Sequence, residues 1–394
     1  VSDYVLAGDT VDEILKRLGD SYASYLSQEN YEKQMEYLDG HFSGIGIYMS
    51  MVDEGVEVVS VIEGSPAEKA GLKQGDIILA AGEHSLSNLK EDQAQNILRG
   101  PNGSEVQLRV KRGTQVLNIN AVREDVEVPT VHSQLLDKHT VYLGVDNFGQ
   151  RTAEEIEDII IGRQKQEANK WIADFRGNPG GYLESAVDIA GLFMGKSAVV
   201  IVKERAMNDL YIARPGSTKM EGPAVLLLDE NSASAAEILA AALQDNQRAI
   251  LLGKTSYGKG TVQEIFPLSN GDKLKITVAR FYSPLGHEIN GVGVKPDIEV
   301  ENENCLAAAR LILSDVPANA HNRAILIDLD RFIVEVDSAI ACQGSYWKAW
   351  GNIIDSIGDK PTYYVKDNKW SLLGDEEKMA KWPQIGRASC RERV

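Results

Sequence analysis

The sequence contains no uninterrupted apolar run approaching the roughly 20 residues that a membrane-spanning helix needs. Basic residues are also in the minority: 41 Lys and Arg stand against 58 Asp and Glu, giving a formal net charge of −17 at pH 7. A chain this acidic has no electrostatic reason to bind nucleic acid or an anionic membrane surface. We therefore expect neither a membrane span nor a nucleic-acid partner within these residues.

Cysteine is scarce, and the three residues present, Cys305, Cys342 and Cys390, have neither metal-ligand spacing nor the spacing of a disulfide framework. The histidines form no recognisable triad or metal-binding motif. They are His41, His84, His132, His139, His287 and His321. We therefore expect no metal and no cofactor, and we interpret the cysteines as ordinary thiols.

A length of 394 residues predicts two or three domains, and 43% hydrophobic with 25% charged residues is typical of a globular protein. Because the chain begins with Val1 rather than Met, the sequence is silent on an export signal. The last ten residues, "IGRASCRERV" (385–394), resemble a translated sequencing adapter. We hypothesise that they are not natural protein and exclude them from functional reasoning.

The spacing of apolar residues predicts four segments before that end. Residues 1–40 are predicted to be helical, and residues 41–125 to mix strands, turns and two helices. Residues 126–313 alternate between strands and helices, which is typical of an α/β sheet covered by helices. Residues 314–384 form a small, β-rich module with a predicted hairpin around Asp330, and the sequence assigns it no role.

The stretch "DENSASAAEILAAALQDN" places Ser232 and Ser234 just before a predicted helix and just after the apolar strand "PAVLLLD". Serine is strongly preferred at helix starts, so a capping role is the ordinary interpretation of either residue. The end of a strand that leads into a helix is also where α/β proteins place their chemistry. A serine there lies at the positive end of the helix dipole.

A nucleophilic serine needs a base, and Lys259 in "GKTSYGKGTVQEIF" follows Ser234 by 25 residues. Gly253, Gly258 and Lys259 also match the start of a phosphate-binding loop, G-x-x-x-x-G-K. That match fails at Gly260, where a Ser or Thr would hold magnesium, and the residues that follow predict a strand instead of a helix. The sequence therefore argues against a nucleotide site and leaves a base or a solvated lysine as alternatives.

The stretch that contains Ser234 and Lys259 resembles part of a known protein family. "DENSASAAEILAAALQDNQRAILLGKTSYGKGTVQ" is similar to the active-site stretch of the carboxyl-terminal processing (tail-specific) proteases. "GHFSGIGI", "IEGSPAEKAGLKQGDIIL", "ILRGPNGSEVQLRVKR", "DFRGNPGGYLESAVDIAGLFM" and "GVGVKPDIEV" extend the resemblance over residues from about 12 to 312. It implies a multidomain α/β fold, in which a crotonase/Clp-protease-like core carries an inserted PDZ domain, with helices before it and the small module after it.

The resemblance implies a serine–lysine mechanism, with Ser234 as the nucleophile, Lys259 as the general base and Gln263 as the residue that positions the lysine. Ser232 keeps the structural role of a cap or loop residue. One departure is Ala236, which stands where the family often has a second serine. That position is not the nucleophile, so the departure leaves the assignment intact.

A lysine serves as a base only when its pKa falls below its ordinary value of about 10.4, and burial without a counter-ion has this effect. The residues on either side of Lys259 include no acid that would hold it charged. If residues 261–265 form a strand, Thr261 and Gln263 share one face and Glu264 points away. Neutral Lys259 would then take the serine proton and return it to the leaving amine.

The loop "DFRGNPGG" has a turn as its ordinary interpretation, but the resemblance implies that it supplies one amide of an oxyanion hole. Gly180 and Gly181 are the candidates, and the Ala235 amide is the second donor. Glycine suits this role because the backbone can approach a substrate closely.

Residues 41–125 resemble a bacterial-protease PDZ domain. Its carboxylate-binding loop would be "SGIGI", in which the backbone amides of Gly44, Ile45, Gly46 and Ile47 face a free C-terminus while the peptide adds to the sheet edge. A tight turn is the alternative for these glycines. Arg99 lies in the "RGPNG" turn, and either couples this domain to the protease core or makes a surface salt bridge.

We therefore predict a serine endopeptidase that recognises proteins by free apolar C-terminal tails. One alternative is a non-catalytic PDZ scaffold, which would have no need for a serine, lysine and glutamine in this pattern. The other is an acyl-CoA enzyme of the crotonase fold, which the PDZ signature argues against. The resemblance also implies work outside the cytoplasm, and it allows a homodimer and a membrane anchor preceding Val1. Whether the PDZ domain activates or restrains cleavage stays open.

Overall fold

The computed structural model describes residues 10–317, 324–341, 343–344, 346–358, 360–366 and 369–372. The chain divides into two compact units: Glu32–Pro129 form one, and the described residues before and after them form the other. Within these ranges, no helix is both long and apolar enough to cross a membrane. The segment 385–394, which we interpret as adapter sequence, and Cys342 and Cys390 lie outside the described residues.

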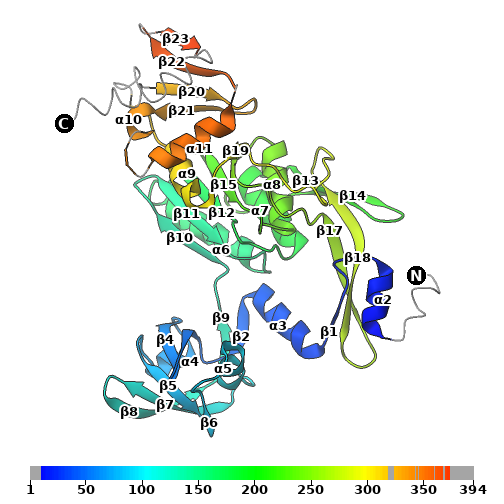
Figure 1. The fold of residues 1–394 in the computed structure, drawn as a ribbon, viewed down its shortest axis with the longest axis vertical. Helices are drawn as coiled ribbons and strands as arrows, with labels where there is room; N and C mark the ends of the chain where they lie inside the picture. The colour runs from blue at the N-terminus through cyan, green and yellow to red at the C-terminus, as the bar shows by residue number, and fades with distance from the viewer. Residues whose placement is uncertain are drawn as a thin grey trace. The chain divides into compact units, whose positions relative to one another are not determined.

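The unit Glu32–Pro129 contains an antiparallel sheet with the strand order β3-β4-β5-β7-β8, two short helices and most of α3 (Gln28–Asp39) (Figure 1). β6 pairs with β5, and β2 pairs separately with β9. The strands are β2 (His41–Gly44), β3 (Ile47–Val52), β4 (Gly55–Val61), β5 (Ile77–Ala81), β6 (His84–Ser85), β7 (Glu105–Arg112), β8 (Gln115–Val122) and β9 (Glu124–Glu127). The helices are α4 (Pro66–Lys69) and α5 (Glu91–Leu98).

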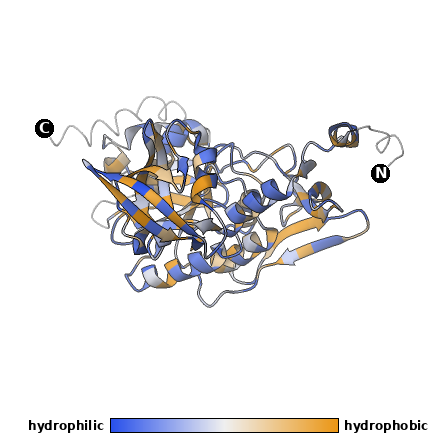
Figure 2. Cartoon of the chain, turned by 90° about the horizontal axis from the view of Figure 1, so that it is seen from below, coloured by the Kyte–Doolittle hydropathy of each residue, from blue (hydrophilic) through white to orange (hydrophobic). Residues whose placement is uncertain are grey.

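Local sequence explains these elements. In β7 the alternating residues Val106, Leu108 and Val110 are buried, and bands of orange and blue along the strands in Figure 2 show such alternation. α4 begins after Ser65, whose hydroxyl accepts the Glu68 N–H, and Pro66 occupies the first helical position.

The second unit is built around a six-stranded sheet with the order β10-β11-β12-β15-β16-β19. β10 is antiparallel to β11, and all later neighbours are parallel. The strands are β10 (Val131–Leu135), β11 (Thr140–Val145), β12 (Lys170–Asp174), β15 (Ala224–Leu228), β16 (Ile250–Gly253) and β19 (Ile298–Glu299). One face packs against α6 (Thr152–Gln164), α7 (Leu183–Met194) and α8 (Ala235–Asp245).

A second sheet in this unit includes a strand from the start of the chain. It runs β1-β18-β13-β14, with β17 paired to β18. Its strands are β1 (Ser24–Leu26), β13 (Ala198–Lys203), β14 (Asn208–Ile212), β17 (Thr261–Pro267) and β18 (Lys273–Tyr282). The prediction of helices throughout residues 1–40 is wrong at β1, which separates α2 (Val11–Leu18) from α3 (Gln28–Asp39). Three residues are too few to display the alternation that identifies a strand.

The other face of the main sheet is covered by the C-terminal part of the chain. Ile172, Val225 and Leu252 of the sheet share one apolar cluster with Trp350 and Ile353. This layer comprises η1 (Asn302–Asn304), α9 (Cys305–Ile312), β20 (Ala324–Asp328), β21 (Ile333–Asp337), α10 (Ser338–Ala341), α11 (Trp347–Ile357), β22 (Thr362–Lys366) and β23 (Lys369–Leu372). In Figure 1, α11 lies beside α9. The predicted hairpin around Asp330 is confirmed as the antiparallel pair β20–β21.

Candidate active site

Ser234 lies where β15 leads into α8. Its backbone has φ 55 and ψ −114, a left-handed conformation that costs a non-glycine residue about 1–3 kcal/mol. Such strain persists where the surroundings hold it, and it clusters at functional sites. Ser234 N–H donates to Glu237 Oε2 at 2.9 Å. The next amide, of Ala235, begins the helix and has no acceptor among the described residues.

Ser232 has a structural role, as the sequence predicts. It is fully buried, and its hydroxyl donates to the Phe175 carbonyl at 2.8 Å. Its N–H donates to the Asp229 carboxylate at 3.1 Å, and that carboxylate also accepts the Gly177 N–H at 2.9 Å. Ser232 therefore fixes the turn before Ser234 to the loop after β12.

The first glycine of "NPGG", Gly180, lies against Ser234. A Cβ on Gly180 would come within 2.8 Å of Ser234 Cβ and 2.9 Å of Ala235 N, so only glycine fits there. Gly180 N–H already donates to Asn178 Oδ1 at 2.8 Å. Gly181 N–H has no acceptor in the described part of the chain. Of the two predicted candidates, Gly181 is the one whose amide has no acceptor among the described residues, and it directly follows the glycine that packs against Ala235.

Lys259 follows β16 in the loop that approaches the start of α8. Burial lowers the pKa of its amine, and the positive charge of Lys275 lowers it further. The negative charge of Glu237 opposes both effects but does not outweigh them. Its Nζ lies 5.6 Å from the centroid of the Tyr22 ring. No hydrogen bond or ion pair joins Nζ to another described residue. This is the half-buried, unpaired lysine that a base requires.

Gln263 lies on β17, where its amide nitrogen donates to Thr261 Oγ1 at 2.7 Å. The two residues share a face, and Glu264 is exposed, as a strand here predicts. No hydrogen bond between Gln263 and Lys259 is found in the described residues. The positioning role of Gln263 therefore stays a prediction.

Sequence reasoning missed Glu237. Residues adjacent in the chain include no acid near Lys259, but the fold brings this buried carboxylate to the lysine loop, where it accepts the Lys259 N–H at 2.8 Å. The chain neighbours of Lys259 include no acid, as predicted, and the acid comes instead from 22 positions upstream. Two features of the sequence could have identified Glu237. It stands three residues after Ser234, which is the spacing of a capping box, and it is an acid in a helix made largely of Ala, Ile and Leu.

The described residues hold no group of three or more His, Cys, Asp or Glu side chains that could bind a metal. No hydrogen bond or ion pair in those same ranges joins a histidine to Ser234 or Lys259. Among the histidines, His287 instead approaches Asp245 at 3.3 Å. Lysine is thus the base candidate that the geometry offers.

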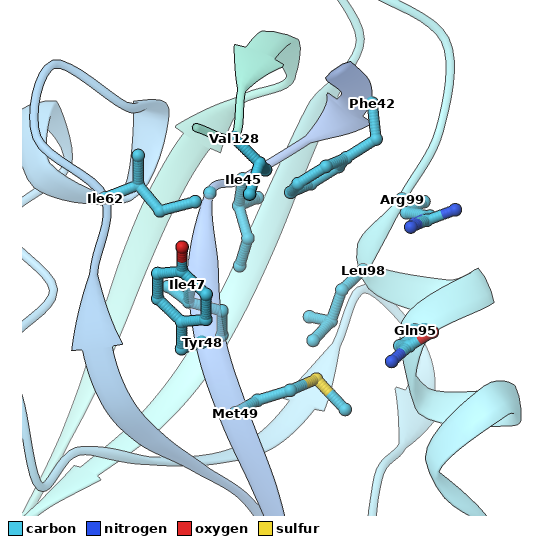
Figure 3. A pocket seen from close by; sticks show the side chains of 11 residues that line it. Phe42, Ile45, Ile47, Tyr48, Met49, Ile62, Gln95, Leu98, Arg99 and Val128 are labelled. Atoms are coloured by element: carbon cyan, nitrogen blue, oxygen red, sulfur yellow. The ribbon is translucent and has the colours of Figure 1, made fainter. Parts of the chain in front are cut away.

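Ile45, Gly46 and Ile47 of the predicted carboxylate-binding loop form one wall of an apolar pocket in the unit Glu32–Pro129, whereas Gly44 ends β2 and is paired with Glu124. A cavity of about 170 Å³ lies between this loop, β3 and α5. In Figure 3, apolar side chains such as Ile45 and Leu98 point into it, while Gln95 and Arg99 lie on the α5 side. Its lining consists of Phe42, Ile45, Gly46, Ile47, Tyr48, Met49, Ile62, Gln95, Leu98, Arg99 and Val128.

Arg99 makes the salt bridge that the sequence allowed. Its guanidinium pairs with Glu36 at 2.6 Å and lies 5.0 Å from the centroid of the Phe42 ring. The ring also lines the pocket, so the Arg99–Glu36 pair braces one of its walls. Coupling of Arg99 to the protease core stays a prediction.

Comparison with known proteins agrees with this arrangement. Residues 139–300 match the model of peptidase family S41, and residues 43–122 match a PDZ domain model. The carboxyl-terminal-processing protease of Picosynechococcus is 34% identical over 305 residues, covering 75% of this chain and 73% of that protein. The carboxy-terminal processing protease CtpA of Bacillus subtilis is 33% identical over 302 residues, covering 76% of this chain and 65% of that protein.

The fold agrees as well. A Bacteroides fragilis protein assigned to the S41 proteases superposes with a TM-score of 0.50 at 18% identity, covering 78% of this chain and 87% of that one. The predicted family resemblance and the predicted α/β fold with a PDZ domain are thus confirmed. This chain spans about two thirds of the length of its Bacillus relative.

Proposed function

The chain belongs to peptidase family S41, and from this premise we propose that it is a serine endopeptidase that acts on proteins recognised by their C-terminal tails. The observation that carries the proposal is that one carboxylate, Glu237, accepts the N–H of Ser234, which lies in a strained turn, and that of Lys259, whose amine has a lowered pKa. A scaffold that only binds peptides would need neither feature. The proposed Ser–Lys pair, together with the match to a PDZ domain model, also argues against an acyl-CoA enzyme.

In this mechanism Lys259, neutral because of its burial, accepts the proton of the Ser234 hydroxyl as Oγ attacks the carbonyl carbon of the scissile bond. The negative charge that develops on the carbonyl oxygen is stabilised by the Ala235 and Gly181 amides. The Lys259 ammonium then protonates the leaving amine, and an acyl-enzyme remains on Ser234. Water, deprotonated by Lys259, releases the product and restores the serine.

The apolar pocket supports recognition of a tail whose last residue is apolar. β3 is an edge strand of its sheet, so a peptide can add to it by backbone hydrogen bonds while its last side chain enters the pocket. The amides of Gly44–Ile47 would receive the terminal carboxylate. Family membership supports action outside the cytoplasm and allows a homodimer, and we propose both on that basis.

A gel assay on an unstructured protein with an apolar C-terminal tail tests the proposal. We expect the wild-type protein to cleave it, and Ser234→Ala and Lys259→Ala to lose cleavage. Undiminished cleavage by Ser234→Ala would overturn the mechanism.

The recognition step has a separate test with Ser234→Ala, which cannot consume the ligand. A fluorescent peptide with an apolar C-terminal residue should bind it, and the same peptide with an amidated C-terminus should bind much more weakly. Equal binding of the two peptides would contradict recognition of the carboxylate. Peptide binding together with an inactive wild-type protein would favour the scaffold.

A further inference from the structure

Glu237 is a buried carboxylate that both halves of the candidate active site share. It lies in the first turn of α8 and is 0% exposed. Oε2 accepts the N–H of Ser234 at 2.9 Å and the N–H of Lys259 at 2.8 Å. Oε1 accepts the N–H of Gly258 at 2.6 Å and the hydroxyl of Ser256. One side chain thus joins the serine turn to the lysine loop.

These four donors determine the state of the group. A carboxylate offers about four acceptor positions, which match three backbone N–H groups and the Ser256 hydroxyl. The Ser256 oxygen already accepts the Val294 N–H at 2.7 Å, so its own O–H is left to donate to Glu237. Glu237 is therefore bound as an anion. A buried charge is costly unless it is fully hydrogen-bonded, so this arrangement tolerates no loss of a partner. The other buried residues of α8 are apolar, and the capping box of the helix accounts for only one of the four donors that Glu237 accepts.

We propose that Glu237 is a positioning residue for the peptidase reaction, which holds the Ser234 turn and the Lys259 loop in register. This inference rests on the proposed function. Glu237 does not touch the substrate. It acts through the two backbone amides that precede the nucleophilic and basic side chains, and a displacement of about 1 Å between such groups is enough to cost roughly 100-fold in rate.

The charge of Glu237 has a second, opposite effect on Lys259. Charged and titratable groups face the lysine from several elements: Glu237 from α8, Lys275 from β18 and Tyr22 from the N-terminal segment. Tyr22 in turn interacts with Tyr257 and Asp20. The anion favours the charged form of the amine, while burial and Lys275 favour the neutral form. Removing the anion should therefore slow catalysis and, at the same time, let the base lose its proton at lower pH.

The test compares Glu237→Gln and Glu237→Asp with the wild-type protein, using fluorescently labelled casein across a pH series. A Gln side chain replaces two acceptor positions with two N–H donors, so donors would face donors. We expect kcat to fall roughly 10–100-fold with little change in KM, because the loss is one of alignment. The acid limb of the kcat/KM profile should move to lower pH in the Gln variant. It should stay in place in the Asp variant, which keeps the charge and recovers part of the rate.

Glu230→Gln is the matched control, because Glu230 is an exposed acid in the same turn, and it should behave as the wild-type protein. A folded Glu237→Gln variant with wild-type kcat and an unmoved acid limb would overturn the inference. If the Gln variant does not fold, a folded Asp variant with wild-type kcat overturns it instead, and a reduced kcat supports it. Cleavage by Ser234→Ala would be a different failure, that of the proposed function itself.

Discussion

The Nζ atom of Lys259 lies 5.6 Å from the centroid of the Tyr22 ring. Tyr22 precedes β1, and its turn is fixed by Asp20, which accepts the N–H of Tyr22 at 3.0 Å and that of Thr277 at 2.9 Å. The N-terminal segment therefore forms part of the wall around the lysine. Its ring removes water from the amine, which lowers the pKa of Lys259, but as a π-system it also attracts the charged form.

Tyr22→Ala should move the acid limb of the kcat/KM profile to higher pH. Burial is the largest cause of the lowered Lys259 pKa, and at a partly solvated site a cation–π contact is worth only about 0.5–1 kcal/mol. Loss of the ring should therefore raise the pKa of Lys259 and leave less neutral base at pH 7. Tyr22→Phe keeps the ring and should keep the wild-type profile. An Ala variant whose limb does not move, or moves to lower pH, would show that the ring does not act by excluding water.

Lys259→Met should abolish activity and raise stability at neutral pH. The loss in kcat should be at least roughly 10²–10⁴-fold, the usual contribution of a general base. Because the folded-state pKa is lowered, the unfolded chain binds more protons, and the wild-type free energy of unfolding rises with pH up to the ordinary lysine pKa of about 10.4. The gain in Tm of the Met variant should therefore shrink as pH approaches that value.

The control for this prediction is Lys295→Met, which replaces an exposed lysine in the same unit. Its Tm difference from the wild-type protein should be small and nearly independent of pH. Thermal unfolding followed by circular dichroism at several pH values compares the two variants. A Lys259→Met variant that is less stable than the wild-type protein at pH 7 would contradict the prediction, because it would show that the Lys259 amine stabilises the folded protein.

Gly180→Ala should remove activity while leaving a folded protein. Its Cβ would lie 2.8 Å from Ser234 Cβ, so the serine turn or the "NPGG" loop would have to shift. We expect kcat to fall roughly 100-fold. Gly177→Ala, three residues earlier, has a similar left-handed φ of 73 but meets nothing within 4 Å. In urea unfolding, Gly177→Ala should lose about 1 kcal/mol of stability because of its left-handed backbone, and Gly180→Ala should lose more because of the clash. Equal kcat in the two variants would contradict the predicted clash.

The sequence predicts those parts of the site that lie in continuous motifs. The "NPGG" loop, Ser234 and Lys259 follow β12, β15 and β16, respectively. Because these three strands are neighbours in the main sheet, their order alone brings the three segments to the same edge of the sheet. Tyr22 and Glu237 are different, because their roles depend on packing between segments distant in the chain. Tyr22 reaches Lys259 only because β1 pairs with β18, and no motif in the sequence around Tyr22 predicts that pairing.

Residues 314–384 illustrate the same limit at the level of the fold. The alternation of apolar and polar residues predicts a hairpin in this segment. The surface that the hairpin covers cannot be predicted in the same way, because it is formed by strands spread over residues 131–299. In the structure, the apolar side of this layer completes the core behind β12, β15 and β16. The layer is thus part of the fold that holds the active-site strands in place.

Ile353→Ala should therefore destabilise the whole second unit, and not only the C-terminal layer. Ile353 is 0% exposed and packs in the cluster that includes sheet residues, so its truncation should cost about 2–5 kcal/mol. Trp347→Ala, on the same helix but at a residue 48% exposed, is the control and should change stability by about 0.5 kcal/mol or less. Urea unfolding and residual cleavage are followed on the same samples.

This prediction is decided by whether unfolding and the loss of cleavage occur at the same urea concentration. If the layer and the sheet form one cooperative core, loss of cleavage and loss of structure should share one midpoint, and both should shift together in Ile353→Ala. If the layer were an independent module, Ile353→Ala would add an early transition while cleavage persisted to the wild-type midpoint. The shared cluster favours the single transition, because removing the layer would expose Val225, Leu227 and Leu252, which are now fully buried, to water.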